Sequence, residues 1–306
     1  MRVLVSGSSG LIGSALVIKL TQAGHEVVRL VRSREKARAN AVYWHPEKGE
    51  IDGGALENLD ACVHLAGENI AKARWTQKIR QRIRDSRVQG TAILSETLAA
   101  TSPPPRTFIL GAATGYYGSR GDELMREDSP PGEGFMAEVC REWENAVGPA
   151  EIAGVRVVKV RTGVVLSAQG GALVKMLPLF RLGLGGKLGA GGQYMSWITL
   201  DDLVGVILFA LDNEIVGGAV NAVAPGPVTN LQFTRTLGRI LHRPTFLKAP
   251  ASALRFALGE MADEMLLSSL RVHPAKLEKY GFEFTHPDLD TALTDLLSRK
   301  RRRDVD

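Results

Sequence analysis

Seven residues near the start of the chain, Gly-Ser-Ser-Gly-Leu-Ile-Gly at 7–13, constrain the fold more than any other feature. They follow a β-rich run at 2–6 and open a helical pattern at 11–23. Gly24 stands where that helix would end, and a second β-rich run occupies 26–31. Strand, glycine turn, helix and strand within about 30 residues form a βαβ unit. The sequence therefore predicts a parallel sheet that begins at its first strand.

The alternation of strand-like and helical segments continues along the chain. Strand-like runs are expected at 61–66, 107–111 and 155–160, and helices at 76–100, 137–152, 199–211 and over most of 249–297. Thr199 or Asp201 is a suitable N-cap for the helix at 199–211. This order predicts an α/β fold, a Rossmann-type doubly wound parallel sheet with a smaller mixed, mainly helical C-terminal substrate or lid region.

The same pattern suggests a domain division. Residues 1–165 are expected to form the nucleotide-binding domain, to which the chain returns at about 199–230. Glycines punctuate 166–199, where the periodicity is less clear, and the substrate or lid region is expected to span 166–297. Residues 298–306 form a basic tail.

Composition excludes several classes of protein. Of 306 residues, 44% are hydrophobic, which is too many for a disordered chain, and no apolar run approaches the ~20 residues of a membrane span. Cys62 and Cys140 cannot build a disulfide framework, and no Cys/His spacing is typical of a metal site. The first residues resemble no leader sequence. A cytoplasmic protein without a bound metal is therefore expected.

The net charge of +5 depends on the basic tail. Residues 299–306 carry five cations and two carboxylates, so the rest of the chain has a net charge of only +2. The tail is typical of a solvated terminus, since no RNA-binding motif accompanies it. We expect a small-molecule substrate as the partner, with no nucleic acid and no membrane.

The glycine spacing at 7–13 has a chemical interpretation. Glycines in a turn between strand and helix let a pyrophosphate approach backbone N–H groups, and the helix N-terminus favours the anion. The alternative is a tight turn without a ligand. The strand–helix–strand context favours dinucleotide binding.

The residues at the end of the second strand indicate which dinucleotide the chain would bind. An NAD site places Asp or Glu there, on the ribose 2′-hydroxyl. Here the chain has Arg32, Ser33 and Arg34, a set suited to a 2′-phosphate. An exposed basic loop is the alternative, but NADP is the expected cofactor.

Several motifs together resemble the extended short-chain dehydrogenase/reductase family, and within it the epimerase-like branch with a characteristic C-terminal segment, here 249–297. They are the glycine turn, His64-Leu65-Ala66-Gly67-Glu68-Asn69-Ile70, Gly115-Tyr116-Tyr117-Gly118, Arg161-Thr162-Gly163-Val164-Val165-Leu166 and Pro274-Ala275-Lys276-Leu277. The likeness covers about 1–297. Members are often labelled nucleoside-diphosphate-sugar epimerases. The resemblance implies a Rossmann-type NADP-binding core.

The resemblance also assigns cofactor contacts. It places Gly7, Gly10, Leu11, Ile12 and Gly13 against the pyrophosphate, Arg32 and Ser33 at the 2′-phosphate, Leu65, Ala66 and Gly67 along the adenosine and ribose, and Val164 beside the nicotinamide. Arg87 stands where the wider family has Asn. Its side chain either reaches the cofactor or replaces the Asn structurally.

The catalytic residues of the wider family are missing. Short-chain enzymes use a Tyr as acid/base and a Lys four residues later, whose charge lowers the Tyr pKa. The corresponding positions here are Met136 and Cys140, or Phe135 and Val139 in the neighbouring register, and Ala113 stands at the usual Ser/Thr position. No register supplies a Tyr–Lys pair.

Three residues remain as candidates for catalysis: Glu68, Tyr117 and Thr114. Each has a structural alternative, namely loop bridging for Glu68, wall lining for Tyr117 and a misdirected side chain for Thr114. The sequence therefore predicts an NADP(H)-binding oxidoreductase or epimerase-like protein. It would transfer hydride to or from a small carbonyl or carbinol with a non-standard catalytic set. The alternative is a weakly active or inactive NADPH-binding sensor or scaffold, and a homodimer is compatible with either.

Overall fold

The structure is a computed structural model that describes residues 1–37, 40–71 and 74–303 and divides the chain into two units. The first unit contains Met1–Ala113, Glu138–Arg161 and Val204–Val220. The second unit contains Thr114–Ala137, Thr162–Leu203 and Asn221–Asp306. Each unit has its own buried hydrophobic cluster.

The main sheet has the strand order β13-β8-β6-β5-β1-β2-β3-β4 among the described residues. The strands are β13 (Gly218–Ala222), β8 (Arg156–Thr162), β6 (Thr107–Ala113), β5 (Ala61–His64), β1 (Arg2–Ser6), β2 (Glu26–Val31), β3 (Ala41–His45) and β4 (Glu50–Ile51). The first strand, β1, pairs in parallel with β2 on one side and β5 on the other, so Leu4 lies between Val28 and Cys62. The pairs β2–β3 and β5–β6 are also parallel, and the short β4 pairs antiparallel with β3. The predicted parallel sheet is confirmed.

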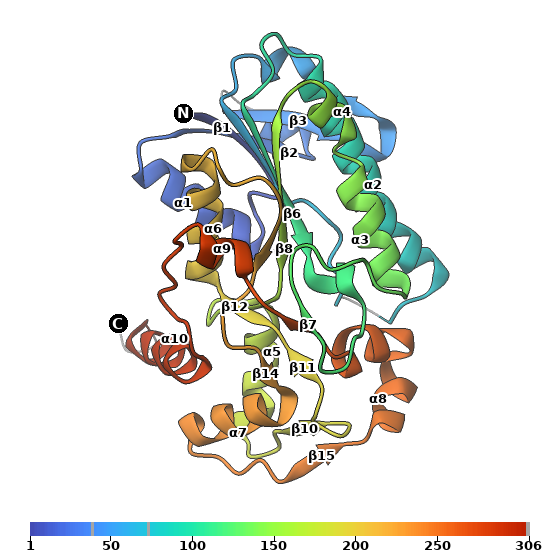
Figure 1. Ribbon diagram of the computed structural model, residues 1–306, viewed down its shortest axis with the longest axis vertical. Helices are drawn as coiled ribbons and strands as arrows, with labels where there is room; N and C mark the ends of the chain where they lie inside the picture. Colours follow the sequence, from blue (N-terminus) through green and yellow to red (C-terminus); the bar gives the residue numbers. More distant parts are fainter. Residues whose placement is uncertain (38–39, 72–73, 304–306) are drawn as a thin grey trace. The chain divides into compact units, whose positions relative to one another are not determined.

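Helices cover both faces of this sheet (Figure 1). In the view of Figure 1, α2 (Gln77–Ala99), α3 (Phe135–Asn145) and α4 (Gly148–Ile152) lie on one side, and α1 (Leu11–Gln22) and α6 (Leu200–Asp212) on the other. Thr76 caps α2, because its side chain accepts a hydrogen bond from the N–H of Ile79. The prediction of one helix over 137–152 is wrong. Pro149 has no N–H to donate to the preceding turn, so a new helix begins at Gly148.

Short two-stranded pairs and helices build the second unit. The paired strands are β9 (Val164–Leu166) with β12 (Trp197–Thr199), β10 (Gly186–Leu188) with β15 (Leu247–Ala249), β11 (Tyr194–Met195) with β14 (Val228–Thr229), and β7 (Leu124–Met125) with β16 (Arg271–Val272). The helices are α5 (Gly171–Arg181), α7 (Asn230–Leu241), α8 (Ala251–Leu258), α9 (Ala275–Lys279) and α10 (Leu289–Arg303), with short turns η4 (Thr114–Tyr117) and η5 (Ala262–Leu267). Trp197, Phe233 and Leu293 lie in their common core. The predicted helical character of 249–297 is confirmed.

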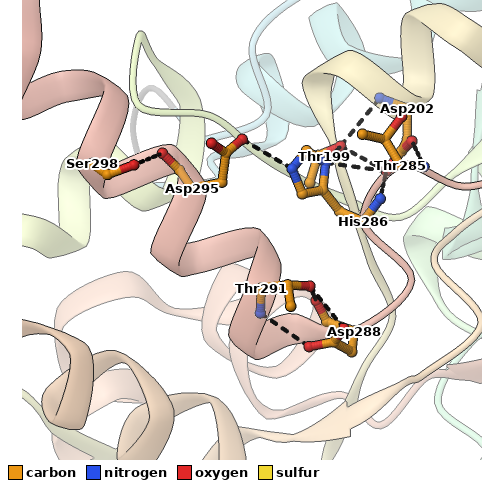
Figure 2. Close-up of polar contacts among 8 residues, drawn as sticks. All are labelled: Thr199, Asp202, Thr285, His286, Asp288, Thr291, Asp295 and Ser298. Atoms are coloured by element: carbon orange, nitrogen blue, oxygen red, sulfur yellow. Dashed lines mark hydrogen bonds and ion pairs between the residues drawn. The ribbon is translucent and has the colours of Figure 1, made fainter.

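A buried polar cluster connects the C-terminal segment to the start of α6 (Figure 2). The Asp202 carboxylate accepts hydrogen bonds from the backbone N–H of Thr285 at 2.7 Å and of His286 at 3.1 Å. Thr199 is the N-cap of α6, since its hydroxyl oxygen accepts from the N–H of Asp202 at 3.1 Å. On the other side, His286 Nε2 lies 3.0 Å from Asp295 Oδ2 of α10.

Asp288 directly precedes α10 in the same region (Figure 2). The N–H of Thr291 donates to its Oδ1 at 3.0 Å, and the Thr291 hydroxyl donates to Oδ2 at 2.7 Å. These hydrogen bonds hold the pKa of the Asp288 carboxyl below its ordinary value.

The backbone of α10 continues through Arg303, into the predicted basic tail. The side chains of 299–303 and the residues 304–306 lie outside the described part of the chain. Among the described helices, none combines the length and the apolar character needed to cross a membrane.

Candidate functional site

The glycine turn joins β1 to α1 in a space that admits no side chains at two positions. Gly7 has φ +64°, and a Cβ there would lie 2.7 Å from the carbonyl carbon of Leu65. A Cβ on Gly13 would overlap the carbonyl oxygen of Gly7. The N–H of Gly10 donates to that same oxygen at 3.0 Å. The turn is therefore packed against itself and against the loop after β5.

A buried serine and histidine hold that loop in place. The Ser6 hydroxyl oxygen accepts hydrogen bonds from the N–H groups of Leu65 at 3.0 Å and Ala66 at 3.2 Å. With both lone pairs used, its proton is donated to His64 Nδ1, 2.6 Å away. The imidazole proton is therefore assigned to Nε2. His64 is fully buried, and burial lowers its pKa to about 3.

This burial makes folding stability depend on pH. Because the folded His64 stays neutral down to about pH 3, only the unfolded chain takes up its proton as the pH falls below ~6.5. Stability from this residue is therefore complete above ~6.5 and is lost as the pH falls. Between pH 7 and 5 we expect a loss of about 2 kcal/mol in the free energy of unfolding.

Urea denaturation of the wild type and of His64→Asn at both pH values measures this loss. The Asn carboxamide oxygen can still accept from Ser6, but the side chain does not titrate. The variant should show a pH dependence smaller by about 2 kcal/mol over this range. An equal dependence in both proteins would refute the assignment.

Arg87 of α2 also holds the loop that follows β5. Its Nη1 donates to the carbonyl oxygens of Glu68 and Ile83, both at 3.1 Å, and its guanidinium stacks over the Trp143 ring at 5.1 Å. Burial lowers the pKa of this guanidinium. Of the two interpretations of Arg87, these contacts favour the structural one.

The end of β2 presents two arginines in different environments. Arg34 stacks over the Tyr43 ring at 4.1 Å and pairs with Glu50 at 3.2 Å. Arg32 is exposed, and no hydrogen bond or ion pair to it is found among the described residues. Since β2 is the neighbour of β1, Arg32 and Ser33 follow the strand beside the glycine turn. Of these two arginines, Arg32 is thus the one that has no side-chain partner in the described part of the chain.

Glu68 bridges its loop to α2. Its carboxylate lies 3.3 Å from Arg82 Nη2 and is 22% exposed. Its backbone N–H donates to the Ser86 hydroxyl at 3.0 Å. The side chain remains partly accessible to solvent.

Thr114, Tyr117 and Val164 belong to the second unit. Tyr117 is fully buried, and its hydroxyl donates to Asn221 Oδ1 at 2.7 Å. The buried Thr114 hydroxyl donates to the carbonyl oxygen of Thr162 at 3.4 Å. Val164 begins β9 and pairs with Trp197. Tyr117 and Thr114 therefore have partners inside the protein.

The positions that would carry a Tyr–Lys pair are apolar and buried. Phe135, Met136, Val139 and Cys140 are at most 8% exposed. None of these side chains offers a group for proton transfer near neutral pH, except a buried thiol.

Comparison with known protein families identifies the family of this chain. Residues 3–222 match the model of the NAD dependent epimerase/dehydratase family. The chain belongs to this family. Residues 249–296 match a further model, a domain of unknown function designated DUF1731. The predicted resemblance to the epimerase branch, with its C-terminal segment, is confirmed.

Relatives within the epimerase family cover nearly the whole length of the chain. An epimerase family protein of Mycobacterium leprae is 45% identical over 97% of this chain and 96% of its own. The crystal structure of the human epimerase family protein SDR39U1 with NADPH has a TM-score of 0.88 and 36% identity, covering 97% of this chain and 99% of the human one. A nucleoside-diphosphate sugar epimerase from Corynebacterium glutamicum has a TM-score of 0.80 and 35% identity, covering 100% of this chain and 62% of that longer chain.

Two carboxylates with structural contacts, one in each unit, were not predicted from the sequence of this epimerase family member. Glu264, from the C-terminal segment, caps α3 by accepting hydrogen bonds from the N–H groups of Phe135 at 3.1 Å and Met136 at 3.3 Å. Glu144 forms a buried two-point ion pair with Arg161, 2.8 Å at each contact. The Arg161-Thr162-Gly163 motif marked Arg161, one partner of the ion pair. No local pattern predicted that Glu264 caps α3.

Proposed function

We propose that this epimerase family member is an NADP(H)-binding oxidoreductase that transfers hydride to or from a small carbonyl or carbinol compound. One observation carries the cofactor part of the proposal: the glycine turn of the first unit has no room for side chains at Gly7 and Gly13. Such a turn brings the backbone close to a pyrophosphate.

The residues of the first unit fit the cofactor. Gly10, the N-cap of α1, makes no side-chain cap, and the first turn of α1 has no acidic residue. The first backbone N–H groups of α1 are therefore suited to donate hydrogen bonds to an anion. Leu65, Ala66 and Gly67 follow β5 next to the turn, in the loop that Ser6 and Arg87 hold. When bound, NADP(H) supplies or accepts the hydride at its nicotinamide ring.

Arg32 is the residue that we expect to select NADP(H) over NAD(H). A charge-assisted contact with the 2′-phosphate contributes about 1.5–3 kcal/mol, which corresponds to roughly 10–100-fold in affinity. In a fluorescence titration, Arg32→Ala should lose that factor for NADPH and leave NADH binding unchanged. Arg34→Ala is the matched control, because its guanidinium is held by Tyr43 and Glu50. If the NADPH/NADH ratio changes with Arg34 instead, Arg32 does not select the cofactor.

Glu68 is the candidate that we favour for proton transfer. It is partly exposed, whereas Tyr117 and Thr114 are buried and have internal partners. We expect Glu68→Gln to abolish NADPH oxidation with a panel of small aldehydes and ketones while NADPH binding persists. Arg82→Gln removes the ion-pair partner and keeps the carboxylate, so it should keep the activity.

A second candidate function is an NADPH-binding sensor or scaffold without turnover. The buried apolar residues Phe135, Met136, Val139 and Cys140 favour it, because the usual acid/base pair has no replacement at those positions. Tight NADPH binding with no oxidation by any carbonyl in the panel would support the sensor. Oxidation that depends on Glu68 would support the oxidoreductase.

A further inference from the structure

An apolar and basic surface of the second unit is uncovered. We name it the β15 surface and define it by Leu182, Leu184, Phe246, Leu247 and Phe256 together with Arg181, Arg243, Lys248 and Arg255. Phe246 is 80% exposed, Phe256 86% and Leu182 73%. Isolated exposed hydrophobic residues are ordinary, but a group of them rimmed by polar residues marks an interaction site.

Contacts between distant segments bring 181–186 next to 243–247, and α8 follows β15 in the chain. Arg243 Nε donates to the carbonyl oxygen of Arg181 at 2.7 Å. A Cβ on Gly183 would lie 3.6 Å from Pro244. In the β10–β15 pair, Gly186 lies opposite Leu247, and α8 begins two residues after β15. Figure 1 shows β10, β15 and α8 at the same end of the second unit, at the bottom of the view.

The helix α8 packs against its own unit only partly, through the half-buried Ala251, Leu254 and Leu258. Its eight residues, Ala-Ser-Ala-Leu-Arg-Phe-Ala-Leu, include one charged side chain, and none of them is buried. Short helices draw their stability from packing an apolar face against a neighbour. A helix of this composition with no buried residue therefore indicates a partner outside the chain.

The charge of the surface indicates which partner. The segments 171–200 and 230–259 contain three and five Lys or Arg residues respectively, and neither contains an Asp or Glu. Carboxylates from elsewhere reach two of these cations, Asp263 on Arg255 and Asp290 on Arg239. Arg181, Arg243 and Lys248 remain exposed. The partner is therefore anionic.

Two other partners fit this surface less well. A second copy of the chain would place the same cations against one another, which is unfavourable. Single-stranded nucleic acid stacks its bases on aromatic rings, and this mode of binding does not involve exposed leucines. An anionic bilayer satisfies both features, since apolar side chains enter the boundary between headgroups and acyl chains while cations meet the phosphates.

We propose that the β15 surface docks this protein onto an anionic phospholipid bilayer. Phe246, Phe256 and Leu182 enter the boundary between headgroups and acyl chains, and Arg181, Arg243 and Lys248 contact lipid phosphates. The low net charge of the chain led to the opposite expectation. Docking depends on the local field of the surface, however, because charges farther away than about 10 Å are screened.

Vesicle co-sedimentation of the whole chain tests the proposal. The vesicles contain one-third phosphatidylglycerol and two-thirds phosphatidylcholine, with pure phosphatidylcholine as the neutral comparison. We expect binding to the anionic vesicles that weakens as salt is added. Arg181→Gln with Lys248→Gln should weaken it by about fivefold per cation. Phe246→Ser with Phe256→Ser should weaken it by roughly tenfold or more.

Matched controls separate this surface from the rest of the chain. Ile152→Ser with Ile215→Ser removes two exposed hydrophobic residues of the first unit, and Lys19→Gln with Lys78→Gln removes two of its exposed cations. Both should bind as the wild type does, as should a chain that ends at Ser298. Thermal melting checks that every variant folds.

Several results would overturn the proposal. The first two are that the wild type does not bind the anionic vesicles, or that it binds the neutral vesicles equally well. The other two are that the β15 variants bind as the wild type does, or that the chain ending at Ser298 no longer binds. If sedimentation velocity shows a dimer, and the variant with both Phe246→Ser and Phe256→Ser no longer forms it, the surface belongs to a second copy of the chain instead. If a single-stranded oligonucleotide releases the protein from the vesicles and binds the β15 variants more weakly than the wild type, the surface belongs to nucleic acid instead.

Discussion

Arg161→Met is expected to lower the free energy of unfolding by about 3–5 kcal/mol, the largest single effect that the structure predicts. Arg161 Nε and Nη2 each lie 2.8 Å from a carboxylate oxygen of Glu144. The two side chains are only 4% and 6% exposed. Removing the cation leaves a buried carboxylate without its charge partner, which costs more than the pair itself contributes. Urea denaturation of the wild type and the variant measures the loss.

Two further variants show whether the effect comes from the isolated charge. Glu144→Leu combined with Arg161→Met removes both charges and should recover most of the stability. Lys159→Met breaks the more exposed pair with Glu151, whose side chains are 18% and 45% exposed, and should cost less than about 1 kcal/mol. A double variant as unstable as Arg161→Met alone would show that lost packing, and not an uncompensated charge, causes the effect.

Gly13→Ala is expected to damage both the cofactor site and the fold of the first unit. The added Cβ would overlap the carbonyl oxygen of Gly7, so the turn or the start of α1 must shift. Overpacking of this kind costs about 1–3 kcal/mol in stability. A displaced turn also misplaces the N–H groups proposed to hold the pyrophosphate, so NADPH affinity should fall by roughly 10–100-fold. Fluorescence titration and thermal melting together measure the two effects.

Gly217→Ala is the matched control for the glycine turn. A Cβ there meets no atom within 4 Å, and the residue does not have positive φ. Its NADPH affinity and melting temperature should stay close to the wild type. If Gly13→Ala binds NADPH equally well, the turn does not hold the cofactor, and the proposed function loses its main support.

Local sequence patterns predicted the sheet and the glycine turn well. β1, β2 and α1 agree with the predicted 2–6, 26–31 and 11–23, because hydrophobic periodicity and a glycine turn act within a few residues. The absence of a Tyr–Lys pair is also a property of the sequence alone. The short strands of 162–199 could not be predicted, because two or three residues show no period and each pairs with a distant segment.

The burial and the hydrogen-bond partners of the candidate residues depend on contacts between segments far apart in the chain. Ser6 holds the Leu65 loop, which lies 59 residues away. Asn221, 104 residues away, accepts the Tyr117 hydroxyl, and Glu264, 129 residues away, caps α3 at Phe135.

The sequence by itself determined the first βαβ unit, the glycine turn, the basic end of β2 and the missing catalytic pair. Only the tertiary structure decided that Arg87 braces a loop, that Tyr117 is buried and that, among the described residues, Arg34 has side-chain partners and Arg32 has none. The physical reason is that a side chain's partner and exposure depend on long-range packing, whereas turns and periodicity depend on neighbours in the chain.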